Sequence, residues 1–333
     1  SVTLIYIITQ ALFKSNFLSL SATALISLDG LHLVMSRTAL LDIFLSFFIL
    51  LTFYLVIKEK YWQAGITIGL ALATKWSALY FIALFGFVTL FRLFRQESTK
   101  ELLRTVTLRI MQFGVIPISI YITSWIGWFI SGRGWNRDYA SNPFSSLIYY
   151  HKQMLDFHTS LVEKHAYQAN PWSWLIMGRP TSFFYETPKD CGADKCSQEV
   201  LALGTPILWW VGTVAIAVVI GFWIKSFVQK RYEPPLNVIV AGIAAGYLPW
   251  FFFQKRTTFS FYAIVFEPFL ILAIIYCIYV ALLHFEKKRN TYVIVGLVGF
   301  AIFVNFIYFL PLFTGDVITY DSWQARMWLP SWI

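Results

Sequence analysis

Long uninterrupted apolar segments constrain this chain more than any other feature of its sequence. A helix needs about 20 apolar residues to cross a bilayer, and only helices or closed barrels satisfy their backbone polar groups in lipid. The apolar segments fall at about 1–13, 16–35, 38–57, 61–74, 76–94, 110–130, 204–224, 236–253, 262–283 and 292–312. They predict an all-α polytopic membrane protein with about nine or ten transmembrane helices, the first one partial.

The composition agrees with this interpretation. Hydrophobic residues make up 58% of the 333 residues and charged residues 13%, whereas an ordinary soluble domain has about 25% charged residues. So few charges exclude a soluble enzyme, a disordered chain and a disulfide-dense secreted module. The net charge of +9 therefore indicates a cytoplasmic excess of Lys and Arg rather than nucleic-acid binding.

Basic clusters between the apolar segments set the expected orientation. By the positive-inside rule, the cytoplasmic clusters are those at 58–60, 92–109, 225–231 and 287–289. We therefore expect N-terminal transmembrane helices over 1–131, a long external loop over 132–203, C-terminal transmembrane helices over 204–313 and an external tail over 314–333. Within the first region, 97–109 is typical of an amphipathic helix on the cytoplasmic surface.

The expected external loop is rich in aromatic residues and holds two of the three cysteines. Its Trp, Tyr, Phe and His residues suit contacts with a sugar or a peptide, and they equally suit an aromatic belt at the membrane interface. Cys191 and Cys196 favour a disulfide, because the external compartment is oxidising and no second cysteine pair is present to complete a zinc site. We expect no metal site.

Charged residues at the external ends of helices are the candidate site residues. An ionisable group at membrane depth costs about 2.5–3.5 kcal/mol on insertion scales, so it faces a partner or a wet cavity. Arg37 either faces the anionic head group of a lipid substrate, orders a loop carboxylate, or forms an interhelical ion pair with Asp42. His32 is interpreted as a packed histidine.

Lys75 and the stretch 254–262 add further cations. Lys75 lies between two short apolar runs and either binds a phosphate as a point charge or extends to the lipid head groups. Arg256, beside a second cation and two hydroxyls, forms an anion site at a helix N-terminus or an ordinary polar turn. Glu267, next to Pro268, is interpreted as a hydrogen-bonded carboxylate at a helix kink.

Several short stretches carry a resemblance when taken together. In chain order they are Leu28-Asp-Gly-Leu-His, Ser36-Arg-Thr-Ala-Leu-Leu-Asp42, Lys75-Trp-Ser-Ala-Leu-Tyr, Ser124-Trp-Ile-Gly-Trp-Phe129, Asp156-Phe-His-Thr, Asn170-Pro-Trp-Ser-Trp, Gly178-Arg-Pro-Thr-Ser-Phe, Cys191-Gly-Ala-Asp-Lys-Cys196, Leu201-Ala-Leu-Gly-Thr-Pro and Arg256-Thr-Thr-Phe. By their order and spacing the chain resembles actinobacterial protein O-mannosyltransferases, from near Ser1 to about Asp316.

The resemblance implies a GT-C glycosyltransferase of the bacterial plasma membrane, with its active site on the extracytoplasmic face. Such an enzyme would transfer mannose from polyprenyl-phosphate mannose to Ser or Thr hydroxyls of translocating proteins, near the secretion machinery and without a cofactor. The residues that the resemblance singles out are Arg37, Arg256 and Lys75, for the donor phosphate or for ordering a loop, and Asp42, His158 and Arg179 in support.

In that family the acidic base belongs to the first external loop, which would precede Ser1. The resemblance therefore assigns the base to no residue of this chain, and it predicts a fragment with little or no transferase activity. The alternatives are a membrane transporter or flippase, and an inactive truncated transferase. Transport is disfavoured because no internal repeat is visible and the ionisable residues gather at one face.

Overall fold

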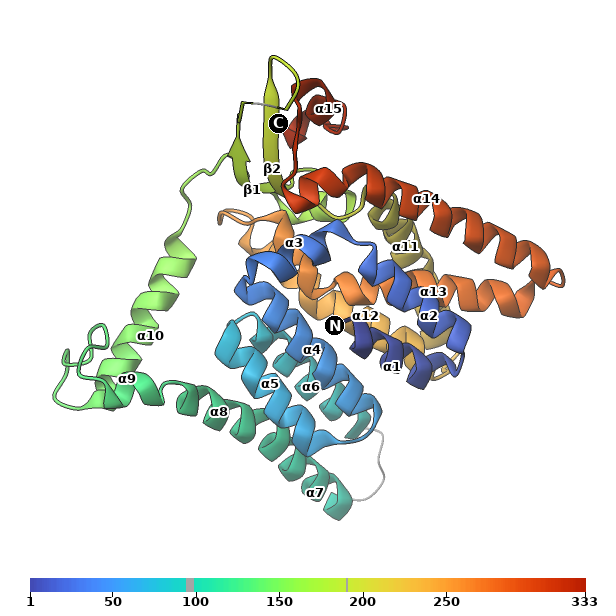
Figure 1. The fold of residues 1–333 in the computed structure, drawn as a ribbon. Coiled ribbons are helices and arrows are strands. Elements are labelled where there is room, and N and C mark those ends of the chain that lie inside the picture. The colour runs from blue at the N-terminus through green and yellow to red at the C-terminus, as the bar shows by residue number, and fades with distance from the viewer. Residues whose placement is uncertain (94–98, 190) are drawn as a thin grey trace.

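The computed structural model describes residues 1–93, 99–189 and 191–333, and its side chains outside 89–101 and 190. Its N-terminal helices pack into one bundle (Figure 1). They are α1 (Val2–Phe13), α2 (Asn16–Ser27), α3 (Gly30–Thr38), α4 (Leu41–Ile57), α5 (Tyr61–Thr74) and α6 (Ala78–Leu93). The axes of α2 and α3 differ by 61°, and Asp29 caps α3 at this bend by accepting a hydrogen bond from the His32 N–H at 3.3 Å.

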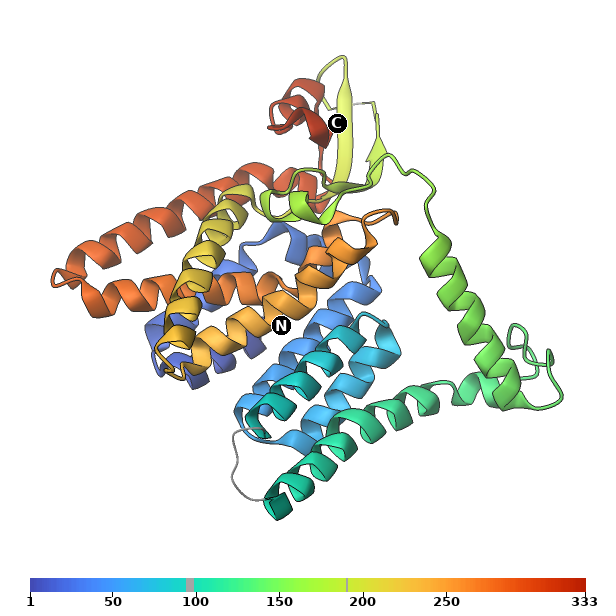
Figure 2. The same cartoon turned by 180° about the vertical axis from the view of Figure 1, so that it is seen from behind.

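A long helical segment leaves this bundle and leads into an arm. α7 (Thr99–Ile110), the π-helical turn η1 (Met111–Val115) and α8 (Ile116–Ser124) follow one another without a break. After the short α9 (Ile126–Ile130), α10 (Pro143–Ser160) runs back toward the small sheet, as both views show (Figures 1 and 2). The amphipathic segment expected at 97–109 is helical from Thr99, and its first two residues lie outside the described residues.

The region expected as an external loop, 132–203, is largely ordered. Besides α10 it contains a 3-10 helix, η2 (Pro171–Ile176), and a hairpin of two antiparallel strands, β1 (Thr181–Glu186) and β2 (Cys196–Ala202). The C-terminal segment adds the third strand, β3 (Val317–Thr319), so that the strand order is β1-β2-β3. The tail therefore folds onto the hairpin, and α15 (Tyr320–Gln324) and η5 (Pro330–Trp332) follow the third strand.

The C-terminal helices complete the bundle. They are α11 (Pro206–Val228), α12 (Pro234–Tyr247), α13 (Glu267–His284) and α14 (Lys288–Thr314), with the 3-10 helices η3 (Leu248–Phe253) and η4 (Ser260–Val265) between α12 and α13. In the described part of the chain, the segments long and apolar enough to cross a bilayer are Leu102–Ser124, Pro206–Val228, Pro234–Phe253, Glu267–His284 and Lys288–Thr314.

The bent pair α2–α3 passes the same test as one span, and shorter apolar helices lie at Val2–Phe13, Leu41–Ile57 and Ala78–Val88. The chain is thus a multi-pass membrane protein. The predicted total of about nine or ten crossings is reached only when these shorter helices are counted with the full-length ones, because a helix of 12 residues is shorter than the roughly 20 that a perpendicular crossing needs.

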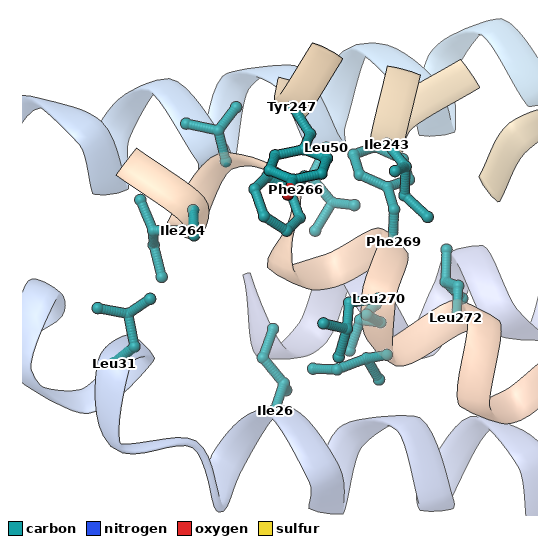
Figure 3. Close-up of a cluster of buried hydrophobic side chains, with 14 of the residues drawn as sticks. Ile26, Leu31, Leu50, Ile243, Tyr247, Ile264, Phe266, Phe269, Leu270 and Leu272 are labelled. Atoms are coloured by element: carbon teal, nitrogen blue, oxygen red, sulfur yellow. The ribbon is translucent and has the colours of Figure 1, made fainter. Parts of the chain in front are cut away.

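The core lies where α13 and η4 meet the N-terminal helices (Figure 3). Phe266 and Phe269 are fully buried there. A Cβ atom at Gly242 would overlap the Phe269 ring, so glycine at this position lets α12 approach α13 closely. Between helices in lipid, such close contacts stabilise the bundle through van der Waals packing.

A polar network joins the bend between α2 and α3 to the first turn of α11. The buried Asp29 Oδ1 accepts hydrogen bonds from the Thr205 N–H at 2.8 Å and from the Trp209 Nε1–H at 3.0 Å. The Thr205 hydroxyl donates to the Leu28 carbonyl at 2.7 Å and accepts from the Gly30 N–H at 3.1 Å. These bonds satisfy the backbone groups that the bend leaves without helical partners.

We expect Asp29→Ala to destabilise the protein by at least about 2 kcal/mol, because it leaves the buried N–H groups of Thr205 and Trp209 without acceptors. Thermal unfolding in detergent measures the change as a Tm several degrees lower. Asp138→Ala is the matched control, since the Asp138 side chain is 88% exposed. Equal Tm values for the two variants would contradict this role of Asp29.

Candidate active site

Asp42 and Lys75 form an ion pair at the end of the bundle where α4 begins and α5 ends. Lys75 Nζ lies 2.7 Å from Asp42 Oδ1, and the Asp42 side chain is only 7% exposed. Asp42 belongs to the first turn of α4, where the helix dipole favours a carboxylate. Lys75 also lies over the Tyr262 ring, 4.1 Å from its centroid. The ammonium is therefore held by a carboxylate and an aromatic face together.

This pairing corrects one of the interpretations of Arg37. Asp42 is paired with Lys75, not with Arg37, because the chain turns sharply between α3 and α4, with a left-handed Ala39. Arg37 instead donates to the Phe313 carbonyl at 3.0 Å and so ties α3 to α14. Its expected role toward the donor phosphate or a loop stays a prediction.

Arg256 lies on the turn between η3 and η4 and contacts α10. Its guanidinium NH2 group donates to His158 Nδ1 at 3.3 Å. Its Nε is buried and has no hydrogen-bond partner among the described residues. A buried guanidinium N–H without an acceptor is costly, and an anionic ligand would satisfy it.

Lys75, His158 and Arg256 belong to one electrostatic site. Burial lowers the pKa of His158, and the nearby positive charges of Arg256 and Lys75 lower it further. Burial raises the pKa of Tyr262 to about 12; the charge of Asp42 also raises it, and that of Arg256 lowers it. We call Asp42, Lys75, His158, Arg256 and Tyr262 the cation cluster. With His158 neutral, two cations face one carboxylate, so the cluster carries a net positive charge.

Arg179 lies apart from the cation cluster and holds the tail in place. Its Nε and NH2 groups donate to the Ala166 carbonyl at 3.1 and 2.9 Å, and NH1 donates to the carbonyls of Ser331 and Ile333. Within the described residues, no hydrogen bond or ion pair joins Arg179 or Arg37 to the cation cluster. Arg179 therefore joins the expected loop to the C-terminal tail by hydrogen bonds.

Sequence reasoning missed a second buried pair. His32 Nδ1 lies 2.8 Å from Glu267 Oε2, so His32 is partnered rather than merely packed. Pro268 does not kink a helix, because α13 begins at Glu267 and proline is tolerated in the first turn. The partners are 235 residues apart in the sequence. No local pattern signals such a pair.

The expected loop contributes a disulfide and an aromatic cluster. A disulfide joins Cys191, in the loop of the hairpin, to Cys196, the first residue of β2. The Trp76 ring stacks on His151 of α10, and the Tyr121 hydroxyl bonds to both side chains, at 2.9 Å to Trp76 and 2.6 Å to His151. These aromatic contacts therefore pack the arm against Trp76, the residue that follows Lys75. The sequence had suggested contacts with a sugar or peptide, or an aromatic belt, and neither interpretation described this packing.

A large apolar cavity lies away from the cation cluster. Its volume is about 1310 Å³, and it is lined by side chains of α2, α11, α13 and α14. Neither Lys75 nor Arg256 lines it. In the described part of the chain, no three His, Cys, Asp or Glu side chains gather as metal ligands. The cation cluster is accordingly the site with the chemistry for a charged ligand.

Comparison with a solved structure shows the fold. The fold matches a structure of the Saccharomyces cerevisiae protein O-mannosyltransferase Pmt1–Pmt2 complex, described as bound to the sugar donor. The TM-score is 0.82 at 14% identity, and the match covers 100% of this chain and 79% of that chain. The chain therefore has this fold, which is the GT-C-type architecture that the sequence predicted.

Comparison of sequences shows the family. Residues 1–126 match the family model described as dolichyl-phosphate-mannose-protein mannosyltransferase, and residues 143–332 match the C-terminal four-transmembrane region of protein-O-mannosyltransferase. The chain belongs to the protein O-mannosyltransferase family, and it is a glycosyltransferase. The predicted resemblance is thereby confirmed, and a transferase is favoured over a transporter or flippase.

Curated relatives extend over nearly the whole chain. Proteins named polyprenol-phosphate-mannose–protein mannosyltransferase are 29% identical in Mycolicibacterium smegmatis, over 98% of this chain and 74% of the relative. The corresponding protein of Mycobacterium tuberculosis is 27% identical, and the match covers 99% of this chain and 74% of that protein. The protein of the same name in Corynebacterium glutamicum is 29% identical, and the match covers 98% of this chain and 73% of that protein.

We expect Arg256→Ala to raise the pKa of His158, because removal of a neighbouring positive charge makes the protonated imidazole less unfavourable. NMR titration of ¹³C-histidine-labelled protein measures the shift, with the His158 signal assigned from its loss in His158→Gln. Lys255→Ala, which removes the adjacent exposed cation, is the control and should leave that pKa in place. An unchanged pKa in Arg256→Ala would contradict the shared electrostatic site.

Proposed function

We propose that this protein transfers mannose from polyprenyl-phosphate mannose to Ser or Thr hydroxyls of acceptor proteins. The observation that carries the proposal is the buried, unpartnered Nε of Arg256 beside Lys75 and His158. It is supported by the actinobacterial relatives, which are named for this donor and for protein acceptors.

The cation cluster suits the chemistry of the leaving group. As the acceptor oxygen attacks the sugar C1, the C1–O bond to the phosphate breaks and negative charge develops on the departing polyprenyl phosphate. Fixed cations in a poorly solvated site stabilise that charge in the transition state. Arg256 offers an unpaired N–H for it, and Lys75 is held nearby by Asp42. Asp42 is thus a positioning residue for Lys75, and we do not assign it as the base that takes the hydroxyl proton.

We further propose that the cation cluster faces the extracytoplasmic side of the bacterial plasma membrane, where translocating acceptors emerge near the secretion machinery. Asp42 begins α4 and Lys75 ends α5, whereas the basic cluster 58–60 joins the other ends of these two helices. The clusters 225–231 and 287–289 likewise lie at the C-terminal ends of α11 and α13. Basic connections are cytoplasmic by the positive-inside rule.

A mannose-transfer assay tests the proposed function. Membranes containing the native full-length protein receive radiolabelled polyprenyl-phosphate mannose and a peptide rich in Thr and Pro, and label in the peptide is measured. We expect transfer without an added cofactor, because we also propose that side chains and no resident cofactor stabilise the leaving phosphate. Label that crosses the membrane without reaching the peptide would favour transport and overturn the proposal.

Arg256→Ala should lower kcat/KM for the donor by about 100-fold, because the loss of one preorganised group that stabilises the developing charge typically costs that much. Arg256→Lys should recover part of the loss by retaining the charge without the guanidinium geometry. Lys255→Ala is again the matched control. A donor kcat/KM in Arg256→Ala within a factor of two of the unmodified protein would remove Arg256 from the donor site.

A further inference from the structure

Strand β1 has an open edge. The strand order is β1-β2-β3, so β1 pairs on one side with β2 and lies at the edge of the sheet. Within the described residues, its backbone makes no hydrogen bond outside this ladder except that the Ser182 hydroxyl donates to the Phe184 carbonyl at 3.2 Å. An edge strand presents a row of N–H and C=O groups that a further extended chain can pair with.

The edge is accessible and aromatic. Phe184 is 39% exposed and Tyr185 is 41% exposed. Both views place β1 on the side of the sheet toward α10, with β2 between it and α15 (Figures 1 and 2). A polypeptide approaching between the arm and the sheet therefore meets β1 before the rest of the sheet.

A series of aromatic contacts connects the same strand to the cation cluster. The Phe183 ring lies 5.4 Å from that of Phe261, which lies 5.0 Å from that of Tyr262. Tyr262 in turn lies under Lys75. A strand added to a sheet lies about 4.7–4.9 Å from its neighbour and rises about 3.3 Å per residue. A chain paired with β1 therefore lies beside the strand whose Phe183 ring begins these contacts with the cluster.

We infer that the open edge of β1 binds the acceptor polypeptide as an added strand and so presents its hydroxyls to the cation cluster. The inference rests on the proposed function. Strand addition takes its affinity from main-chain hydrogen bonds and leaves specificity to alternate side chains. Strand addition suits extended acceptors of varied sequence, because the hydrogen bonds are made to the main chain, which all polypeptides share.

Photo-crosslinking tests the location of the acceptor. A photoreactive phenylalanine analogue replaces Phe184. In the control it replaces Val317, a 44% exposed residue of β3 at the opposite edge of the sheet. A Tm in detergent equal to that of the unmodified protein shows that each variant is folded. We expect a labelled Thr/Pro-rich peptide to crosslink at position 184 and not at 317, and excess unlabelled peptide to abolish it. Equal crosslinking at both positions would overturn the inference.

Backbone methylation of the peptide tests the binding mode. N-methyl groups at successive positions on either side of the acceptor Thr remove one N–H donor at a time. We expect the acceptor KM to rise about three- to tenfold at alternate positions only, since one strand edge pairs with every second residue. Transfer to the unmethylated peptide without this alternation would overturn strand addition but leave the proposed function intact. No transfer to any peptide would instead count against the proposed function.

Discussion

The buried Asp29 carboxylate is the interaction on which the arrangement of the helix ends depends. A buried carboxyl group is costly unless it is hydrogen-bonded, and Asp29 gains its bonds from Thr205 and Trp209 only when the start of α11 lies against the bend between α2 and α3. α11 begins four residues after β2 ends, so the same contact sets the sheet over this end of the bundle. The elements that carry the cation cluster and the proposed acceptor strand are thereby gathered on one face.

The two cations of the cation cluster, Lys75 and Arg256, have different surroundings. Asp42 neutralises Lys75 and holds it against Tyr262, which orders the ammonium without removing it from the site. His158 has a lowered pKa, so it is neutral near pH 7 and its Nδ1 accepts a bond from Arg256 instead of repelling it. Arg256 is then the cation of the cluster that lacks a carboxylate partner in the described residues, which suits it to a charged leaving group.

Local sequence patterns predicted where the charged residues lie along their helices but not what they contact. The polar interruptions around Lys75 and Arg256 marked helix ends correctly, because apolar segments show where a helix leaves the bilayer. The pairing of Asp42 with Lys75, rather than with Arg37, depends on how α3 and α4 are turned relative to each other. Hydropathy carries no information about that rotation in nearly uniform apolar helices.

The sequence by itself determined the membrane class, the helical architecture, the family and the expected orientation, because these follow from apolar length, the distribution of basic residues and the order of short motifs. Only the tertiary structure decided which charges meet. It joined His32 to Glu267, placed His158 beside Arg256, and turned the expected loop into a sheet with an open edge. These contacts join residues far apart in the chain, so their geometry exists only once the helices have packed.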